Sequence, residues 1–416
     1  MASHRTHRGR WVAVLAVLAL AGCQSTSETS PTAAPSVTAP PSATTSPMGV
    51  TPTDALFYST GGSLYVSEPT GAPGRKLTDG PVDSQPAPSP DLSRLVFVRK
   101  ASAADYGGEL WVVELTPQLA PAGQPRRLVD PAGLTRGGAD VSPPMVASPR
   151  WSPTGRHIAF VDNPTGGTVD GGILTVADAG TGALLPAQER PWAEASFAWA
   201  PDGDHIAWID ARSDVGPVAV NVLTVGGTSS AVATGTNASS VTYADDGSRL
   251  IFTNPDTTDP GMFRENPFTV RVGGVYSARA TAETGAVQPA PTPMFTRQGW
   301  SYSNITTLDS GAVAFTAHED RRGAPSAEMI QVLDKDSSLP RTTVTDLGSN
   351  FICQSSPRGG QVCYASQAPV WGAGDLVAYL DSSPEMHLVV TDIDNRNPKR
   401  IDTSADSFAL PPSPRS

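Results

Sequence analysis

A repeated alternation of a polar turn and an apolar strand runs through most of this chain. Each turn is built on Ser-Pro-Asp-Gly or a close relative, and the strand after it ends in an aromatic residue. Proline sets φ and glycine supplies the positive φ that reverses the chain, so the pattern predicts a tight turn between two strands. Five copies occupy Pro88–Phe97, Trp151–Phe160, Trp199–Trp208, Tyr243–Phe252 and Leu308–Phe315, and a worn sixth copy occupies Trp371–Tyr379.

Each copy belongs to a unit of four strands, which we number first to fourth from the inside outward. The second strand, such as Ile158–Val161 or Ile206–Ile209, is too continuously apolar to have one solvent-exposed face, so we expect it to lie between neighbouring units. An alternating third strand such as Glu109–Glu114 and a more polar fourth strand such as Pro125–Val129 complete the unit. The turn glycines recur about 44 to 64 residues apart, the length of one propeller blade with variable loops.

This arrangement resembles the TolB-like, WD-repeat-like β-propeller family, whose blades carry an S-P-D-G turn before an apolar strand and often end in an R-R-L-T-like strand. The match runs from about Ala55 to the C-terminus. The resemblance implies an all-β propeller of four-stranded antiparallel blades. It does not fix a function, because this fold hosts scaffolds, hydrolase lids and enzymes alike.

The sequence favours seven blades over the alternative of six. Six first strands can be counted, and the segment Ala55–Thr78 holds later strands of a blade with no first strand before them. At the far end, Ser407–Pro412 echoes the first-strand sequence Ser196–Pro201. We therefore expect the C-terminal strand to complete the first blade and close the ring, which removes open sheet edges. TolB itself has six blades, so the resemblance alone would not give seven.

The N-terminus predicts export and a lipid anchor. Three arginines precede the apolar run Trp11–Ala21, which is shorter than the roughly 20 residues that span a bilayer and is typical of a signal peptide. Leu20–Cys23 resembles a bacterial lipobox, so we expect residues 1–22 to be removed and Cys23 to carry lipid. The alternative is an ordinary secretory signal with an incidental cysteine.

The remaining chain divides into a stalk and one domain. Residues 23–51 are almost entirely Ser, Thr, Pro and Ala, which predicts a disordered stalk, and residues 52–416 form the propeller. We therefore predict an extracytoplasmic protein anchored by lipid to a bacterial cell membrane. The Ala-, Pro-, Gly- and Arg-rich composition favours a Gram-positive source.

Charge argues against one class of partner. Removing residues 1–22 takes away three arginines and leaves 26 basic against 40 acidic residues. A domain this acidic, without a basic run, is a poor binder of phosphate backbones, so we expect no nucleic-acid partner.

Two further cysteines, Cys353 and Cys363, stand close together in a Gly- and Ser-rich stretch. Outside the cytoplasm this spacing favours a disulfide-closed hairpin. The alternative is a redox-active or metal-binding pair, but the spacing matches neither C-x-x-C nor a zinc site.

Loop lengths predict a binding face. Long connections fall between second and third strands and between blades, which emerge on the same side, whereas first-to-second and third-to-fourth connections are expected to be short. Gly285–Ser303 is interpreted as one of the long connections between blades. This face is predicted to present a mixture of aromatic, basic and histidine side chains: Phe263, Arg264, Trp300, Tyr302, His318, Arg321, Arg322, Phe351 and Arg358.

Nothing in the sequence indicates a catalytic site, a metal site or a cofactor. There is no G-x-S-x-G motif, so the hydrolase that often accompanies such propellers is missing. We therefore predict a non-catalytic scaffold that binds an envelope protein or a cell-wall ligand. The alternative is a propeller enzyme that acts on glycans or lactones through carboxylates in the axial channel, and carboxylates gathered at the channel mouth would favour it.

Overall fold

The structure is a computed structural model, and it describes most of the chain from residue 55 onward. The described residues are 55–67, 74–103, 105, 108–134, 145–162, 172–185, 192–210, 218–253, 272–281, 289–319, 328–345, 347, 351–355, 361–365, 368–383, 386–401 and 405–412. They belong to one compact unit, Met48–Ser416.

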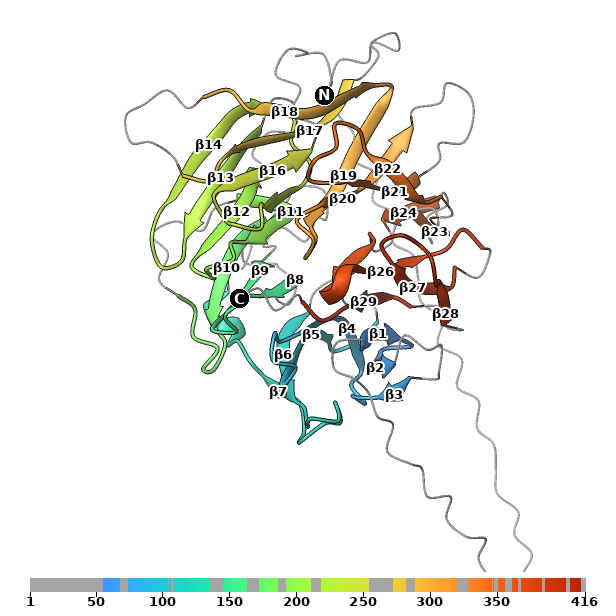
Figure 1. The fold of residues 1–416 in the computed structure, drawn as a ribbon. Coiled ribbons are helices and arrows are strands. Elements are labelled where there is room, and N and C mark those ends of the chain that lie inside the picture. The colour runs from blue at the N-terminus through green and yellow to red at the C-terminus, as the bar shows by residue number, and fades with distance from the viewer. Residues whose placement is uncertain are drawn as a thin grey trace, which may run out of the picture. The chain divides into compact units, whose positions relative to one another are not determined.

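Seven four-stranded antiparallel blades make up this unit, as the sequence predicts. They follow one another around the ring in chain order (Figure 1). Blade 1 contains β29 (Ser407–Ala409), β1 (Leu56–Thr60), β2 (Ser63–Ser67) and β3 (Arg75–Lys76). Blade 2 contains β4 (Val82–Pro88), β5 (Arg94–Lys100), β6 (Glu109–Glu114) and β7 (Arg126–Arg127).

Blades 3 and 4 share one continuous sheet. Blade 3 contains β8 (Val146–Trp151), β9 (His157–Asp162) and β10 (Gly172–Asp178), and blade 4 contains β11 (Trp192–Trp199), β12 (His205–Asp210), β13 (Val218–Thr224) and β14 (Ser229–Thr236). The outer position of blade 3 is filled by residues around Leu184, which forms a bridge to Ala177. The start of β11 also pairs with β10, which joins the two sheets.

The remaining blades are regular. Blade 5 contains β15 (Val241–Tyr243), β16 (Arg249–Thr253), β17 (Val272–Arg279) and β18 (Thr292–Gln298), and blade 6 contains β19 (Trp300–Thr307), β20 (Val313–Glu319), β21 (Glu328–Leu333) and β22 (Arg341–Val344). Blade 7 contains β25 (Val370–Gly372), β26 (Leu376–Leu380), β27 (Leu388–Asp392) and β28 (Lys399–Ile401). A hairpin of β23 (Phe351–Ser355) and β24 (Gln361–Ala365) is inserted between blades 6 and 7, and two short 3-10 helices, η2 (Pro131–Gly133) and η3 (Ala373–Asp375), complete the described elements.

The repeated turns have the geometry that their residues predict. Gly155, Gly203, Gly247 and Gly311 all have φ between 68° and 78°. In the turn after β8, the amide of Gly155 donates to the carbonyl of Ser152 at 2.9 Å, and the amide of Ser152 donates to the carbonyl of His157 at 2.8 Å. A side chain at a glycine with this φ would be strained, so the turn depends on glycine.

The hydrophobic core is divided among the junctions between blades. Among the described residues, seven clusters of buried side chains occur, and each combines residues of two adjacent blades. The second strands supply both faces: in β9, Ile158 and Phe160 pack toward blade 2, whereas Ala159 and Val161 pack toward blade 4. This two-sided burial explains why these strands are apolar without alternation.

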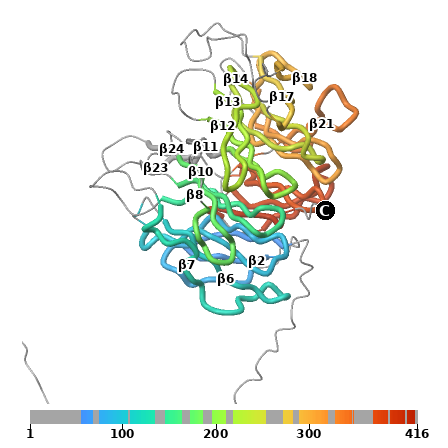
Figure 2. Tube along the Cα trace, turned by 90° about the vertical axis from the view of Figure 1, so that its left-hand side faces the viewer, coloured from blue at the N-terminus to red at the C-terminus, as the bar shows by residue number. Residues whose placement is uncertain are grey.

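The C-terminal strand closes the ring, which confirms the expectation from the Ser407–Pro412 echo. Tyr58 pairs with Phe408, and Phe57 pairs with Ala409, in an antiparallel register. Figure 1 shows β29, in red, beside the blue strands of blade 1, and Figure 2 shows the red C-terminal part of the chain next to the blue strands. Phe408 is 1% exposed and belongs to the cluster between blades 7 and 1, so the last strand joins the two ends of the ring.

Candidate functional site

The two ends of the ring differ in the connections that they carry. We call the end with the second-to-third and interblade connections the connection face, and the opposite end the turn face. Around the axis, the turn face is nearly regular: the connections at 89–93, 152–156, 200–204, 244–248 and 308–312 all have the same length, and the connection at 373–375 in blade 7 is shorter.

Neighbouring turns on the turn face contact one another. The guanidinium of Arg156 lies 2.8 Å from a carboxylate oxygen of Asp204 in the next blade. Between blades 6 and 7, the amide of Gly374 donates to Asp309 at 2.9 Å, and the amide of Asp309 donates to Asp375 at 2.8 Å. The turns near the axis therefore brace each other, and they offer little variation from blade to blade.

The expectation that every third-to-fourth connection is short is wrong. The connection 115–125 in blade 2 and the connection 280–291 in blade 5 are both long, and both lie on the turn face at the outer edge. The interpretation of Gly285–Ser303 as an interblade connection is also wrong. This stretch contains β18, and only Gly299 separates β18 from β19. The contrast between the two faces holds near the axis but not at the periphery.

Trp300 and Tyr302 do not lie in a loop. Both are in β19, the first strand of blade 6, and they are 7% and 1% exposed. Their rings stack with centroids 6.4 Å apart, and the guanidinium of Arg297 lies 4.1 Å from the centroid of the Trp300 ring. Burial raises the pKa of Tyr302 to about 12. The prediction that these two aromatic residues belong to the binding face is therefore wrong, because they form part of the core between blades 5 and 6.

His318 also belongs to a strand instead of a loop. It is the next-to-last residue of β20 and pairs with Glu328 of β21. Its Nδ1 atom lies 3.9 Å from Glu328 Oε1, and both side chains are only partly exposed. Burial raises the pKa of Glu328, and the nearby His318 opposes this rise. Since β20 ends at the connection face, His318 lies at the edge of that face.

The other predicted contact residues cannot be compared with the structure. Phe263, Arg264, Arg321, Arg322 and Arg358 lie outside the described residues, and Phe351 begins β23, where only the backbone is described.

Two of the three cysteines fall on the inserted hairpin. The backbone register places Cys353 directly opposite Cys363, but their side chains lie outside the described residues, so the disulfide stays a prediction. Cys23 and the predicted anchor also lie outside them. Within the described part of the chain, no helix is long and apolar enough to cross a membrane.

A belt of polar contacts links the first strands around the axis, and sequence reasoning missed it. The Ser407 hydroxyl lies 2.7 Å from the Ser59 hydroxyl and accepts a hydrogen bond of 2.7 Å from the amide of Gln85 in blade 2. The side-chain oxygen of Gln85 in turn accepts a hydrogen bond of 2.7 Å from the amide of Ser148 in blade 3.

Equivalent links join other blades. Ser196 accepts from the amide of Val241 at 3.1 Å, Ser240 accepts from the amide of Ile305 at 3.2 Å, and Asn304 donates to the carbonyl of Pro369 at 2.6 Å. The signal was present in the sequence as a serine, asparagine or glutamine in or next to most of the first strands. These side chains satisfy backbone groups that would otherwise face the channel unpaired.

Carboxylates are scarce on the first strands. Asp83 of β4 is buried, and Arg99 binds both of its oxygens at 2.6 and 2.8 Å. Glu194 of β11 has no described side chain. The described residues therefore show no pair of carboxylates in the channel, and none of their His, Cys, Asp and Glu side chains form a cluster of three that could hold a metal ion.

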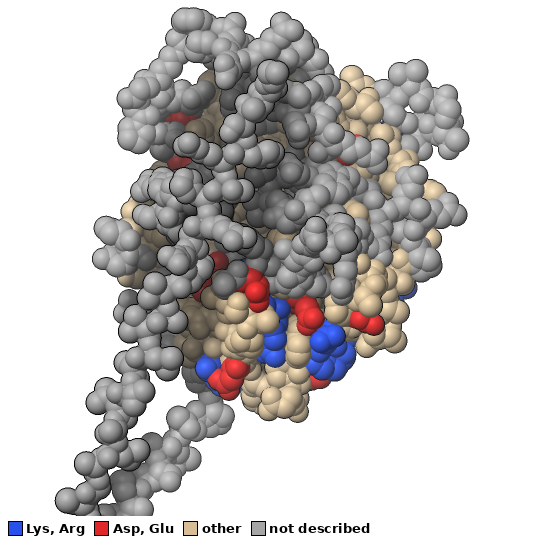
Figure 3. Space-filling model, turned by 180° about the vertical axis from the view of Figure 1, so that it is seen from behind, with Lys and Arg blue, Asp and Glu red and all other residues tan. Residues whose placement is uncertain are grey.

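One first strand carries a cation that is open to water. Arg150, in β8 of blade 3, has an exposed side chain although it lies on an innermost strand. Its guanidinium donates to the carbonyl of Phe197 and lies 4.7 Å from the centroid of the Phe197 ring. On the outer surface, by contrast, basic and acidic side chains are interspersed over the lower part of the view in Figure 3. Some of these outer-surface side chains form ion pairs, such as Arg127 with Glu109 at 3.1 Å and Arg126 with Glu114 at 3.7 Å.

No family model matches the chain, and no curated protein matches it in sequence. Solved structures match its fold. The tricorn protease matches with 11% identity over 85% of this chain and a TM-score of 0.53, and this chain spans 34% of that protein. TolB from Acinetobacter baumannii matches with 14% identity over 77% of this chain and 67% of its own, with a TM-score of 0.48.

The β-propeller domain of the trilobed protease from Pyrococcus furiosus matches with 12% identity over 84% of this chain and 93% of its own, with a TM-score of 0.49. At 11% identity, the match to the tricorn protease supports the propeller fold alone and leaves the function open. TolB proteins are among the structural neighbours, and so are domains of proteases.

Proposed function

We propose that this protein is a lipid-anchored extracytoplasmic scaffold that binds an envelope protein or a cell-wall ligand through its connection face, without catalysis. The lipobox at Leu20–Cys23 and the stalk after it would hold the propeller at the outer side of the membrane.

The contrast between the two faces near the axis carries the proposal. Near the axis, the first-to-second connections on the turn face have one length in five blades and are shorter in blade 7, whereas connections of very different length cover the connection face. On that face, the connection between β1 and β2 holds only Gly61 and Gly62, whereas the β16–β17 connection spans residues 254–271. Variable connections on a rigid scaffold are where binding usually occurs.

The alternative of a propeller enzyme has less support. Glycan hydrolysis needs two carboxylates at a suitable separation. The carboxylate described on the first strands, Asp83, is held by Arg99 in a bidentate ion pair that occupies both of its oxygens.

Site-specific photo-crosslinking on intact cells tests the proposed face. A photoreactive residue at Ser102 or Ser382 would report on the connection face, and one at Ser310 or Asp336 would report on the turn face. All four side chains are exposed and none belongs to a core cluster. We expect Ser102 and Ser382 to form adducts with a common partner that Ser310 and Asp336 do not. Adducts formed only from the turn face would show that the face has been assigned to the wrong side.

A further inference from the structure

Arg150 stands out when equivalent positions of the seven first strands are compared. The strand registers align Arg150, opposite Ala159, with one residue in each of the other blades. Those six residues are Ala87, Ala198, Thr242, Thr306, Val370 and Ala409. All six are small and uncharged, so one blade alone presents a long cationic side chain at this level of the ring.

The position lies on the innermost strands, where four of the six equivalent residues are partly exposed, whereas Ala87 and Thr242 are buried. The residue that follows it in each strand, Trp151 in blade 3 and Trp199 in blade 4, is buried in a core cluster between blades. Side chains alternate along a strand, so Arg150 points away from the cluster that holds Trp151. In a closed ring, an innermost strand meets water through the channel, and the Arg150 side chain is exposed.

The surroundings of Arg150 differ from those of a surface arginine. Although water reaches the side chain, desolvation by the surrounding protein lowers its pKa to about 10. Arginine has five N–H donors, and one of the guanidinium nitrogens bonds to protein, at the carbonyl of Phe197. Among the described side chains, no carboxylate forms an ion pair with Arg150. Among the described residues, donors of the Arg150 guanidinium therefore remain for a ligand.

A purely structural role does not account for this residue. Arg150 does link blades 3 and 4, since its guanidinium reaches Phe197 and its carbonyl accepts a hydrogen bond of 3.1 Å from Trp199 Nε1. However, other junctions are joined by uncharged groups, such as the 2.8 Å bond from Trp151 Nε1 to the carbonyl of Ala87. A link between two blades therefore does not by itself require a cation at this position.

We propose that Arg150 forms an oxyanion site in the axial channel, which binds the carboxylate of a ligand narrow enough to enter between the small side chains of the ring. The planar guanidinium matches a carboxylate in a bidentate geometry. The net charge of the protein is −11, so without Arg150 the field of the protein would oppose an anion. This site is separate from the connection face and does not depend on the partner proposed there.

Calorimetric titration of the propeller with acetyl-alanyl-alanine, and with its C-terminal amide as a neutral match, tests the site. We expect the free carboxylate to bind at least about 10-fold more tightly than the amide, a difference of roughly 1.4 kcal/mol. Arg150→Gln should abolish this preference. Arg150→Lys should reduce it, because lysine keeps the positive charge but loses the bidentate hydrogen-bonding geometry of the guanidinium. The control Arg156→Gln removes an exposed arginine on the adjoining turn and should leave the preference unchanged.

Several results would overturn the proposal. They are equal binding of the two peptides, unchanged preference in Arg150→Gln, loss of preference in Arg156→Gln, or no detectable binding of the carboxylate. Tighter binding of inorganic phosphate than of the carboxylate would also overturn the assignment to carboxylates.

A second measurement needs no variant. Phenylglyoxal should label Arg150 in the folded wild-type protein, and acetyl-alanyl-alanine, but not its amide, should slow that labelling. The same labelling rate with and without the carboxylate would contradict the site even if Arg150→Gln fails to fold.

Discussion

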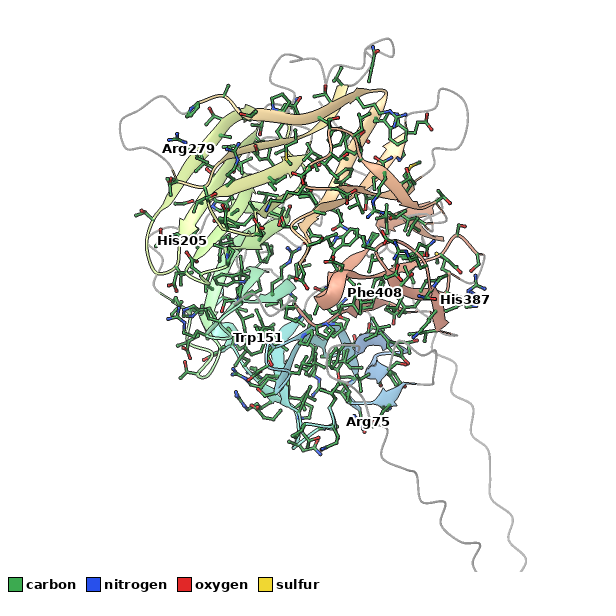
Figure 4. All side chains as sticks on the ribbon, in the orientation of Figure 1. Arg75, Trp151, His205, Arg279, His387 and Phe408 are labelled. Carbon is green, nitrogen blue, oxygen red and sulfur yellow. The ribbon has the colours of Figure 1, made fainter. Side chains whose placement is uncertain are left out.

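Phe408→Ala should weaken the closure of the ring more than any comparable surface change. Phe408 is 1% exposed and lies in the cluster that joins blades 7 and 1, together with Leu56, Tyr58 and Leu410. Figure 4 shows it toward the middle of the ring. The substitution leaves the backbone pairing of β29 with β1 possible but removes the side chain that fills the junction.

The expected loss of unfolding free energy follows from the burial of the phenyl group of Phe408. Truncating a fully buried phenylalanine costs about 3–5 kcal/mol, as lost transfer free energy and a residual cavity. Typical unfolding free energies are only about 5–15 kcal/mol, so this single change removes a large share of the total. Ser407→Ala should cost less, about 1–3 kcal/mol, because it leaves the amide of Gln85 without its acceptor.

Urea denaturation followed by far-UV circular dichroism measures both changes. Leu339→Ala is the matched control, because Leu339 is an apolar side chain that is 69% exposed, and its truncation should change the free energy by less than about 0.5 kcal/mol. The reasoning is refuted if Phe408→Ala is as mild as Leu339→Ala. In that case the C-terminal strand would lie beside blade 1 without holding the ring together.

Three further changes have defined outcomes. Cys23→Ser should move the protein from the membrane to the soluble fraction, and unchanged detergent partitioning would exclude the lipid anchor. The exported protein should gain the mass of two alkylated thiols at Cys353 and Cys363 only after reduction; alkylation without reductant would exclude the disulfide. For Asp381, burial raises the pKa, but hydrogen bonds from Ser383 and the amide of His387, with the Arg400 charge, outweigh it and lower the pKa below 3.8. Its stabilising effect is therefore present at neutral pH and is lost as pH falls through the lowered pKa. Asp381→Asn should lower the unfolding free energy by about 1–3 kcal/mol at pH 7, and the difference from wild type should shrink below pH 3.8; a difference that stays constant down to pH 2 would contradict this account.

The repeat predicted the fold well because each of its parts has a local physical cause. The turn glycines and the apolar second strand recur in one order, and the structure confirms both. The expectation that the aromatic residue ends the second strand is wrong, because the strands continue beyond it, as β9 does after Phe160. Closure by Ser407–Ala409 was also predictable, because the first-strand pattern reappears at the C-terminus.

Strand boundaries away from the turns were not predictable in the same way. Trp300 begins β19 directly after Gly299, with no Ser-Pro-Asp-Gly signal to mark the start of the strand. Pro293 lies in β18, and the proline-rich sequence around it reads as a loop. Proline is tolerated there because β18 is the outermost strand of its blade and needs no donor on its free edge.

The belt of polar links and the Arg150 position required the registers of the strands. A serine near the start of one strand gives no indication of which amide in the next blade it will bind. Likewise, Arg150 is unusual only in comparison with the six small residues at equivalent positions, and bulges in several first strands hide that equivalence in the sequence.

Binding and turnover measured together test the central claim, that the connection face binds a ligand without catalysis. The partner recovered by crosslinking would be titrated with the wild-type propeller and then weighed by intact-mass spectrometry after prolonged incubation. The account predicts saturable binding that Ser102→Trp with Ser382→Trp abolishes and that Ser310→Trp with Asp336→Trp leaves unchanged, and it predicts that the mass of the partner stays the same. Cleavage or modification of the partner by the wild-type protein, or loss of binding only in the turn-face variant, would contradict it.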